Sequence, residues 1–142
     1  MTSAVIDGTY YAALPDDGAS RCDTDLEPGD PHGAIVRSQA WLSTSARRAV
    51  YIIQPNPASN LQLVAFIAIG MVEVSTCEIT RGNGPVAAGD QIGLFHFGGS
   101  SYMLLLKPQP GFEVVFEDVH KRPIRPGQHR WVNSGIARVR PV

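Results

Sequence analysis

Two apolar runs separated by four small residues are the feature that most constrains the fold of this chain. The runs occupy residues 92–97 and 102–106, and Gly-Gly-Ser-Ser lies between them at residues 98–101. Short apolar runs bounded by turn residues are typical of buried strands. Glycine adopts backbone angles that other residues avoid and lets another group approach the peptide plane. The sequence therefore predicts two strands and a tight joint inside one sheet.

The joint has two interpretations from the residues alone. In the first, the hydroxyl of Ser100 is a nucleophile beside the exposed carbonyl of Gly99. In the second, the small residues are needed only to form a hairpin or a bulge. The pattern of residues leaves both interpretations open.

The joint and three other segments resemble the phosphatidylserine decarboxylases. Residues 93–101, Gly-Leu-Phe-His-Phe-Gly-Gly-Ser-Ser, are similar to the self-cleavage segment of that family. Residues 8–12, 37–42 and 70–78 also resemble family segments, in the same order and at similar spacing. The resemblance extends from about residue 8 to the C-terminus. It is strongest to the soluble branch that includes a tryptophan decarboxylase.

The resemblance implies a cofactor that the chain makes from itself. In this family the motif serine attacks the carbonyl of the preceding glycine, the peptide becomes an ester, and elimination then cuts the chain. Here the cleaved bond would join Gly99 to Ser100, leaving residues 1–99 and 100–142 as the two products. The remnant of Ser100 would be a pyruvoyl group. Through a Schiff base, this group would release CO2 from an amino acid or from phosphatidylserine.

Other residues near the joint are candidates for the same site. Gly98 and Gly99 carry backbone amides that can stabilise the oxyanion formed during cleavage. His96 lies four positions before the motif serine and is a candidate base, although its alternative role is packing or a hydrogen bond within the sheet. Gly98, Ser101 and Glu73 are candidate substrate-binding residues. Glu73 is an acid among apolar neighbours, and strand alternation could equally place it in solvent.

Two catalytic motifs of the family are not found in the sequence. The relatives carry a Tyr-His-x-x-His-x-Pro motif just before the segment that corresponds to residues 5–11, and an aspartate further upstream. One interpretation is a truncated, non-catalytic relative that binds a partner or ligand. Another is that a missing N-terminal portion, present as a separate chain, completes the site in trans, and a homo-oligomer is a further option for the assembly. The resemblance to the soluble branch favours a soluble amino acid, such as an aromatic one, as the substrate; membrane-bound phosphatidylserine would require an apolar or amphipathic docking surface, and the sequence does not indicate one.

Size and charge narrow the class of protein. The chain has 142 residues, which is the size of one domain with its own core. Its net charge of -1 gives no electrostatic footprint for nucleic acid. The longest apolar run, residues 63–72, is far shorter than the ~20 residues of a membrane helix. We therefore expect a single-domain cytoplasmic protein without a nucleic-acid partner or a transmembrane segment.

The cysteines and acidic residues do not predict a metal site. Cys22 and Cys77 belong to no CxxC pair and to no histidine-rich cluster, so structural zinc is not expected. They are far apart in a chain without a signal peptide, which favours free thiols in a reducing compartment. The acids of residues 16–32 are irregularly spaced, which is typical of a solvated loop.

The remaining patterns predict a mainly β fold. The chain has 14 glycines and 11 prolines, which indicate many turns. A compact β-sandwich or barrel-like sheet with one short helix accounts for these features. Ser38 would cap that helix over residues 39–48, with Arg47 and Arg48 in its last turn, where either could also bind a substrate carboxylate. Strands are expected at residues 9–11, 49–54, 61–79 with a break at Gly70, 112–116, 131–132 and 136–139.

The Asn-Gly turn within residues 81–85 predicts that the strands before and after it pair as a hairpin. A strand, turn, Gly-Asp, strand order at residues 86–97 is also similar to lipoyl and biotinyl carrier domains. No lysine occupies such a turn, so carrier function is not favoured.

Overall fold

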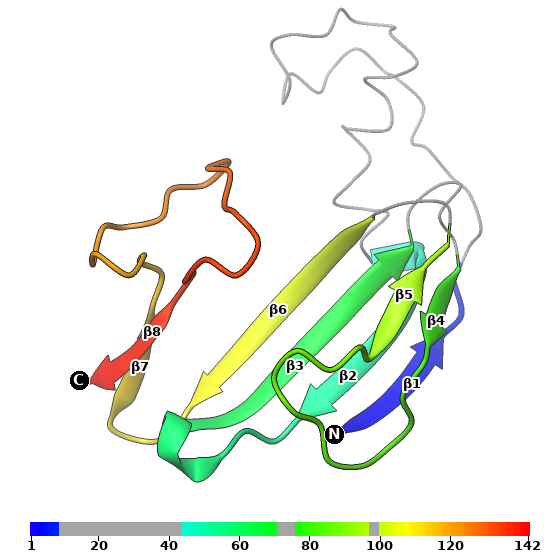
Figure 1. Cartoon of the computed structure of the whole chain (residues 1–142), viewed down its shortest axis with the longest axis horizontal. Coiled ribbons are helices and arrows are strands. Elements are labelled where there is room, and N and C mark those ends of the chain that lie inside the picture. Colours follow the sequence, from blue (N-terminus) through cyan, green and yellow to red (C-terminus); the bar gives the residue numbers. More distant parts are fainter. Residues whose placement is uncertain (9–43, 71–75, 97–99) are drawn as a thin grey trace, which may run out of the picture. The chain divides into compact units, whose positions relative to one another are not determined.

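The structure is a computed structural model, and it describes residues 1–8, 44–70, 76–96 and 100–142. The described chain is mainly β, as the sequence predicted (Figure 1). Its elements are β1 (Thr2–Ile6), β2 (Arg47–Ile53), the 3-10 helix η1 (Pro57–Ser59), β3 (Leu61–Gly70), β4 (Cys77–Ile79), β5 (Gly93–Phe95), β6 (Ser101–Pro108), β7 (Phe112–Val115) and β8 (Arg138–Pro141).

The strands form three sheets. A four-stranded sheet has the order β1-β2-β3-β6, and its neighbouring strands run in opposite directions (Figure 1). Strands β4 and β5 form an antiparallel pair in which Glu78 lies opposite Leu94. Strands β7 and β8 form a second antiparallel pair. The pairing of β4 with β5 confirms the predicted hairpin.

The Asn-Gly sequence has a further role in the structure. It lies in the loop between β4 and β5, and it contacts β1. The backbone N–H of Ser3 donates to Asn83 Oδ1 at 2.9 Å, and the N–H of Gly84 donates to the carbonyl of Met1 at 3.0 Å. These hydrogen bonds satisfy backbone groups of the edge strand that would otherwise face water.

The chain divides into two compact units. The first contains Met1–Tyr51 and Phe66–Met103, and the second contains Ile52–Ala65 and Leu104–Val142. The joint that precedes β6 belongs to the first unit. The β7–β8 pair and the loop between its strands belong to the second.

The core of the first unit is built by strand alternation. Ala49 and Tyr51 of β2, Ala68 of β3 and Cys77 of β4 are buried together. Residues two apart on a strand share a face, so one face of the sheet supplies this cluster. On the same face, aromatic rings form a row across three strands. The ring centroids of Tyr51 and Phe66 are 5.9 Å apart, and those of Phe66 and Tyr102 are 5.4 Å apart.

Two sequence predictions about local structure were wrong. Arg47 and Arg48 are not in the last turn of a helix, because β2 already begins at Arg47. Burial of alternate residues and pairing inside the sheet outweigh the helix propensity of this segment. Thr44 and Ser45, just before β2, are helical, and residues 39–43 of the predicted helix lie outside the described residues. Trp131 and Val132 do not form a strand either, since they lie in a turn and are 81% and 90% exposed.

Candidate active site

The joint connects two different sheets. Strand β5 pairs with β4, whereas β6 lies beside β3 in the four-stranded sheet. The predicted joint inside one sheet is therefore wrong: the chain leaves one sheet after β5 and enters another at Ser101. The physical reason lies in the packing partners, because Phe95 lies opposite Cys77 while Tyr102 packs on Phe66. Gly98 and Gly99 themselves lie outside the described residues.

Ser100 is held at the start of a strand. It is half-buried and directly precedes β6, and Ser101, also half-buried, is the first residue of that strand. Strand alternation assigns Ser100 to the same face as Tyr102, which is the face of the apolar core. Strand β6 begins at the end of the sheet where β3 reaches Gly70 (Figure 1). The candidate nucleophile is thus anchored on its C-terminal side by a strand of the main sheet.

His96 is anchored on the other side of the joint. Its Nε2 lies 2.8 Å from Oε2 of Glu78, and its backbone N–H donates to the carbonyl of Thr76 at 3.4 Å. The side chains of His96 and Glu78 are 44% and 50% exposed. Alternation assigns both to the face of the β4–β5 pair opposite Cys77. The hydrogen-bonding interpretation of His96 is confirmed, and a role as base stays a prediction.

The sequence reasoning did not single out Glu78. A signal was present, because Glu78 and His96 are both polar residues in otherwise apolar strands that the Asn-Gly hairpin was expected to pair. The missing information was the register. Glu78 lies opposite Leu94, so His96 is its diagonal neighbour on one face.

A close contact fixes β5 against the main sheet. A Cβ at position 93 would collide with the hydroxyl of Tyr51 and would lie 2.5 Å from the carbonyl oxygen of Glu78. Only glycine leaves room for this approach. Burial is the largest cause of a raised pKa for the Tyr51 phenol, and the repulsion that its ionised form would experience from an ionised Cys77 raises the pKa further. The phenol therefore stays neutral at ordinary pH.

Cys77 is buried at the start of β4, opposite Phe95 of β5. Its thiol is within 3.8 Å of the carbonyl oxygens of both Arg47 and Ala68, so β2, β3 and β4 meet at this side chain. Burial is the largest cause of a raised pKa for the Cys77 thiol. A buried neutral thiol in this place is a packing residue rather than a nucleophile. The structure records it as a free cysteine.

The other candidates are distributed as follows. Arg47 Nε lies 3.4 Å from Oδ1 of Asp7, and Arg48 donates to the carbonyl of Thr44. Glu73, Cys22 and His32 lie outside the described residues.

In the part of the chain that the structure describes, no group of three or more His, Cys, Asp or Glu side chains is arranged to hold a metal ion. None of the described helices is long and apolar enough to cross a membrane.

Comparison with known proteins identifies the family. The model of the phosphatidylserine decarboxylase family matches residues 6–129. A mainly β chain that carries the Gly-Ser joint between two sheets thus belongs to the phosphatidylserine decarboxylase family, in agreement with the resemblance seen in the sequence.

The relatives include fungal amino-acid enzymes. The chain is 50% identical to decarboxylase iboD of Amanita muscaria (strain Koide BX008) over 137 residues, which are 95% of this chain and 37% of that protein. It is 37% identical to the L-tryptophan decarboxylase of Psilocybe cubensis over 78% of this chain and 24% of that protein. For the L-tryptophan decarboxylase of Psilocybe cyanescens the identity is 33%, over 95% and 29% respectively. The chain thus spans about a quarter to two fifths of these relatives. No solved structure matches it significantly.

Proposed function

We propose that this chain is the self-processing portion of a pyruvoyl-dependent decarboxylase, and that it cleaves itself between Gly99 and Ser100. The observation that carries the proposal is the position of Ser100, half-buried at the start of β6 and directly after the crossing between two sheets. Membership of the phosphatidylserine decarboxylase family supports it. Cleavage there would leave residue 100 at the free end of a strand that stays in the sheet.

The cleavage chemistry requires no other reagent than water. The Oγ of Ser100 bonds to the carbonyl carbon of Gly99, and the peptide C–N bond breaks to give an ester and a free amine. Loss of the α-proton of residue 100 then breaks the ester C–O bond and releases the Gly99 carboxylate. Water then hydrolyses the dehydrated residue, so that its nitrogen leaves as ammonia and a ketone remains. When formed, this pyruvoyl group supplies an electron sink for the departure of CO2.

The two strands next to the joint give this reaction its geometry. His96 is tied to β4 through its side chain and its backbone, and Ser101 is the first residue of β6. The residues between them must therefore span two fixed points. The nucleophile and the carbonyl that it attacks are then held in a restricted arrangement. This lowers the entropic cost of bringing the two groups together, which would be larger in a mobile chain. We assign Glu78 and His96 to this positioning role.

The surroundings of Ser100 fit an apolar group better than a charged one. Tyr102 and Phe66 lie on the face to which alternation assigns Ser100, in contact with each other. An aromatic amino acid offers a ring for such a surface, and two of the relatives are L-tryptophan decarboxylases. We therefore propose an aromatic amino acid as the substrate. Phosphatidylserine is the alternative, suggested by the name of the family.

The test uses the protein expressed from its complete coding sequence. L-tryptophan, L-phenylalanine and micellar phosphatidylserine are supplied separately, and CO2 release is measured. The account predicts CO2 from an aromatic amino acid, loss of activity after phenylhydrazine, which reacts with ketones, and no activity in Ser100→Ala. The matched control is Ser59→Ala, because Ser59 lies in the 3-10 helix η1 of the second unit, where its exposed hydroxyl donates to the carbonyl of Asn56 at 2.7 Å. Activity with phosphatidylserine alone would overturn the substrate assignment, and full activity of Ser100→Ala would overturn the mechanism.

A further inference from the structure

The loop between β7 and β8 is organised around one buried carboxylate. Asp118 is only 4% exposed. Its Oδ1 accepts the backbone N–H groups of His120 at 2.8 Å and of Arg122 at 3.0 Å, and its Oδ2 accepts Nε of Arg122 at 2.8 Å. The backbone amide of Arg122, with the Arg122 side chain and the His120 amide, lowers the pKa of Asp118 to about 2. The loop thus contains a carboxylate that is ionised at neutral pH and is paired with one arginine.

Further hydrogen bonds within the loop fix its conformation. Arg138 donates to the carbonyl of Val119 at 3.0 Å. The backbone N–H of Arg125 donates to Oε1 of Gln128 at 3.2 Å, and the N–H of Ile124 donates to the carbonyl of Phe116 at 3.0 Å. These contacts all lie within the second unit. The loop is therefore pre-organised, which lowers the entropic cost of binding to it.

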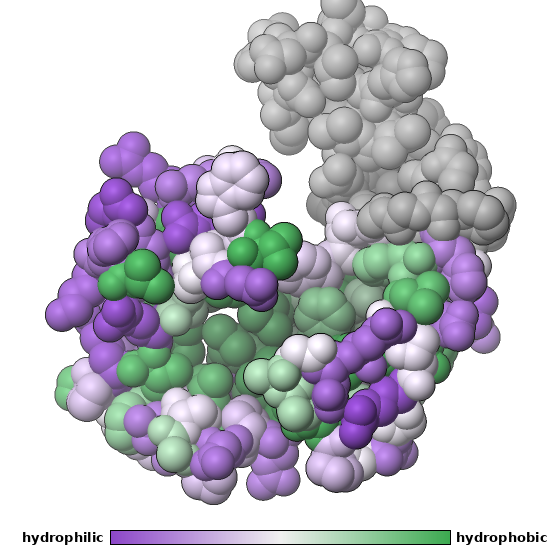
Figure 2. All heavy atoms as spheres, viewed as in Figure 1, coloured by the Kyte–Doolittle hydropathy of each residue, from purple (hydrophilic) through white to green (hydrophobic). Residues whose placement is uncertain are grey.

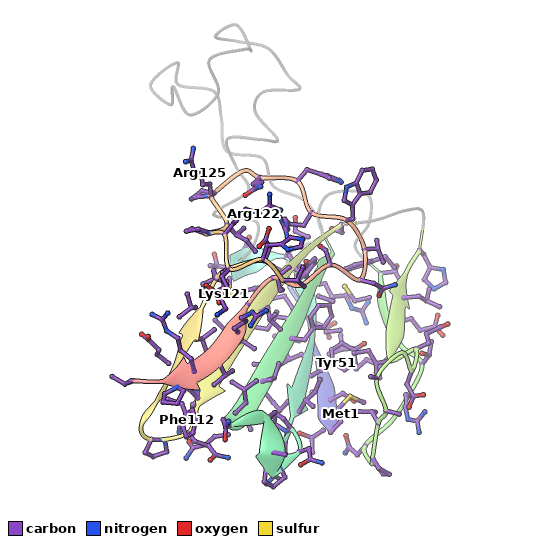
Figure 3. The ribbon with its side chains drawn as sticks, turned by 60° about the vertical axis from the view of Figure 1, so that its left-hand side comes forward. Met1, Tyr51, Phe112, Lys121, Arg122 and Arg125 are labelled. Carbon is purple, nitrogen blue, oxygen red and sulfur yellow. The ribbon has the colours of Figure 1, made fainter. Side chains whose placement is uncertain are left out.

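Two hollows open on this loop, and they share four polar residues. One measures about 520 Å³ and the other about 570 Å³. Both are lined by Asp118, Arg122, Gln128 and Arg130. Hydrophilic side chains predominate over the loop in the space-filling view (Figure 2). Lys121, Arg122 and Arg125 all project from it (Figure 3).

The first hollow has more positive than negative charge. Arg122, Arg125 and Arg130 line it together with one carboxylate, Asp118. Arg122 already pairs with that carboxylate at 2.8 Å. Among the described residues, no carboxylate pairs with the guanidinium of Arg125 or of Arg130. Within the described residues, two cationic groups thus line one hollow and neither is paired with a carboxylate, a situation that favours binding of an anion.

Arg130 also has an unsatisfied donor. Among the residues that the structure describes, none offers an acceptor to its buried Nε, whereas one terminal nitrogen donates to the carbonyl of Gly135 at 3.2 Å. Buried N–H groups are nearly always paired, and an unpaired donor on a charged group is costly. Because Arg130 lines both hollows, an acceptor bound in either one would lie beside its guanidinium group.

We propose that these hollows bind the phosphate group of a phosphorylated ligand. A phosphate dianion matches the two uncompensated guanidinium groups in charge, and its several oxygens can accept from more than one arginine, whereas a carboxylate is a planar monoanion. Trp131 and His129 line the second hollow, with their rings in a T-shaped contact at 5.2 Å, and offer an apolar wall to the organic part of the ligand. Decarboxylation of a free amino acid does not require such a site.

The test titrates the whole chain with inorganic phosphate at low ionic strength and follows the arginine Nε–H signals by NMR. The account predicts a saturable shift of the Arg130 signal. Arg130→Gln and Arg125→Gln should each weaken phosphate binding about 10-fold, the loss expected for one charge-assisted contact. Arg140→Gln is the matched control, because Arg140 lies on β8 and pairs with Glu113 outside both hollows. It should change the affinity less than twofold.

The fold of each variant is checked by the amide signals of His120 and Arg122, which report the hydrogen bonds to Asp118. With these signals unchanged, equal phosphate binding by the wild type, Arg125→Gln and Arg130→Gln would overturn the proposal. Absence of a saturable shift in the wild type would overturn it as well. Vesicles of phosphatidylcholine with and without phosphatidic acid then identify the source. Arginine-dependent binding to phosphatidic acid assigns a lipid headgroup, and binding of soluble phosphate alone assigns a small metabolite.

Discussion

The imidazole of His96 and the carboxylate of Glu78 lie 2.8 Å apart across the pair of strands β4 and β5. This contact fixes the residue at which the chain leaves one sheet. Five residues later, Ser101 begins β6 in another sheet. The bond proposed for self-cleavage lies between these two fixed points, so the pair offers a direct way to alter the geometry of cleavage without changing Ser100.

Removal of the carboxylate should slow self-cleavage. Glu78→Ala removes the partner of His96, and we expect the cleavage rate to fall about 10-fold because the joint loses one of its anchors. Glu78→Gln should have a smaller effect, because its amide can still form a neutral hydrogen bond with the imidazole. The rates are measured by denaturing gel. Glu113→Ala is the control, since it removes another exposed carboxylate, one that pairs with Arg140 on β8.

A further variant separates positioning from proton transfer. His96→Gly removes the ring altogether, and added imidazole can replace a missing base but cannot restore a link between strands. The positioning role predicts slow cleavage that imidazole does not accelerate. Rescue of His96→Gly by imidazole would instead assign His96 as the base. An unchanged cleavage rate in Glu78→Ala would show that the contact between Glu78 and His96 has no role in cleavage.

The sequence was sufficient for the general class of the fold, because local patterns determine it. Alternating apolar residues and Gly-Pro turns predicted a mainly β chain, and the Asn-Gly signal predicted that β4 and β5 pair. It could not show which sheet each strand joins. The runs on both sides of residues 98–101 look alike, yet β5 pairs with β4 and β6 lies beside β3. Such pairings depend on contacts between distant residues, which periodicity does not record.

The candidate site was predictable in part for the same reason. Ser100 and His96 belong to one short motif, so both can be identified from the sequence. Glu78 and Tyr51 become neighbours of β5 only through sheet register and packing. The beginning of β2 at Arg47 was also unpredictable locally, since the segment before it favoured a helix and tertiary pairing determined the outcome.

Position 93, in β5, should tolerate no residue larger than glycine. In Gly93→Ala, the new methyl group would meet the Tyr51 hydroxyl and the backbone of Glu78, which cannot move aside as a flexible side chain can. We expect a loss of about 1–3 kcal/mol in the free energy of unfolding, as for other overpacked sites. Urea denaturation measures it. The matched control is Gly82→Ala, where an added Cβ meets nothing within 4 Å. Equal stability of the two variants would contradict this packing.

Asp118 should make the stability of the protein depend on pH in acid. Its pKa falls from an ordinary 3.8 to about 2 in the folded protein, so its contribution is fully present above about pH 4. It is lost as the pH falls from about 4 to about 2, because the carboxylate then binds a proton. The stability difference between wild type and Asp118→Asn should therefore be constant at neutral pH and shrink in this range. Urea denaturation at a series of pH values tests this, and a constant difference down to pH 2 would refute it.

Cys77 should resist alkylation in the folded protein. Burial raises the pKa of its thiol, so little thiolate is present at neutral pH and the sulfur is also inaccessible. In a Cys22→Ser background, we expect iodoacetamide to modify Cys77 at least about 10-fold more slowly than after unfolding in urea. Mass spectrometry follows the reaction. Equally fast labelling of folded and unfolded protein would show that this part of the core is open.

The intact mass of the purified protein, measured beside Ser100→Ala, tests the central claim most directly. The account predicts two fragments that meet between Gly99 and Ser100, with a pyruvoyl group in place of the serine at the start of the second. The Ser100→Ala variant should remain a single chain, and Ser59→Ala should be cleaved as the wild type is. A single uncut wild-type chain, expressed from its complete coding sequence and identical in behaviour to Ser100→Ala, would contradict self-processing and leave a non-catalytic member of the family.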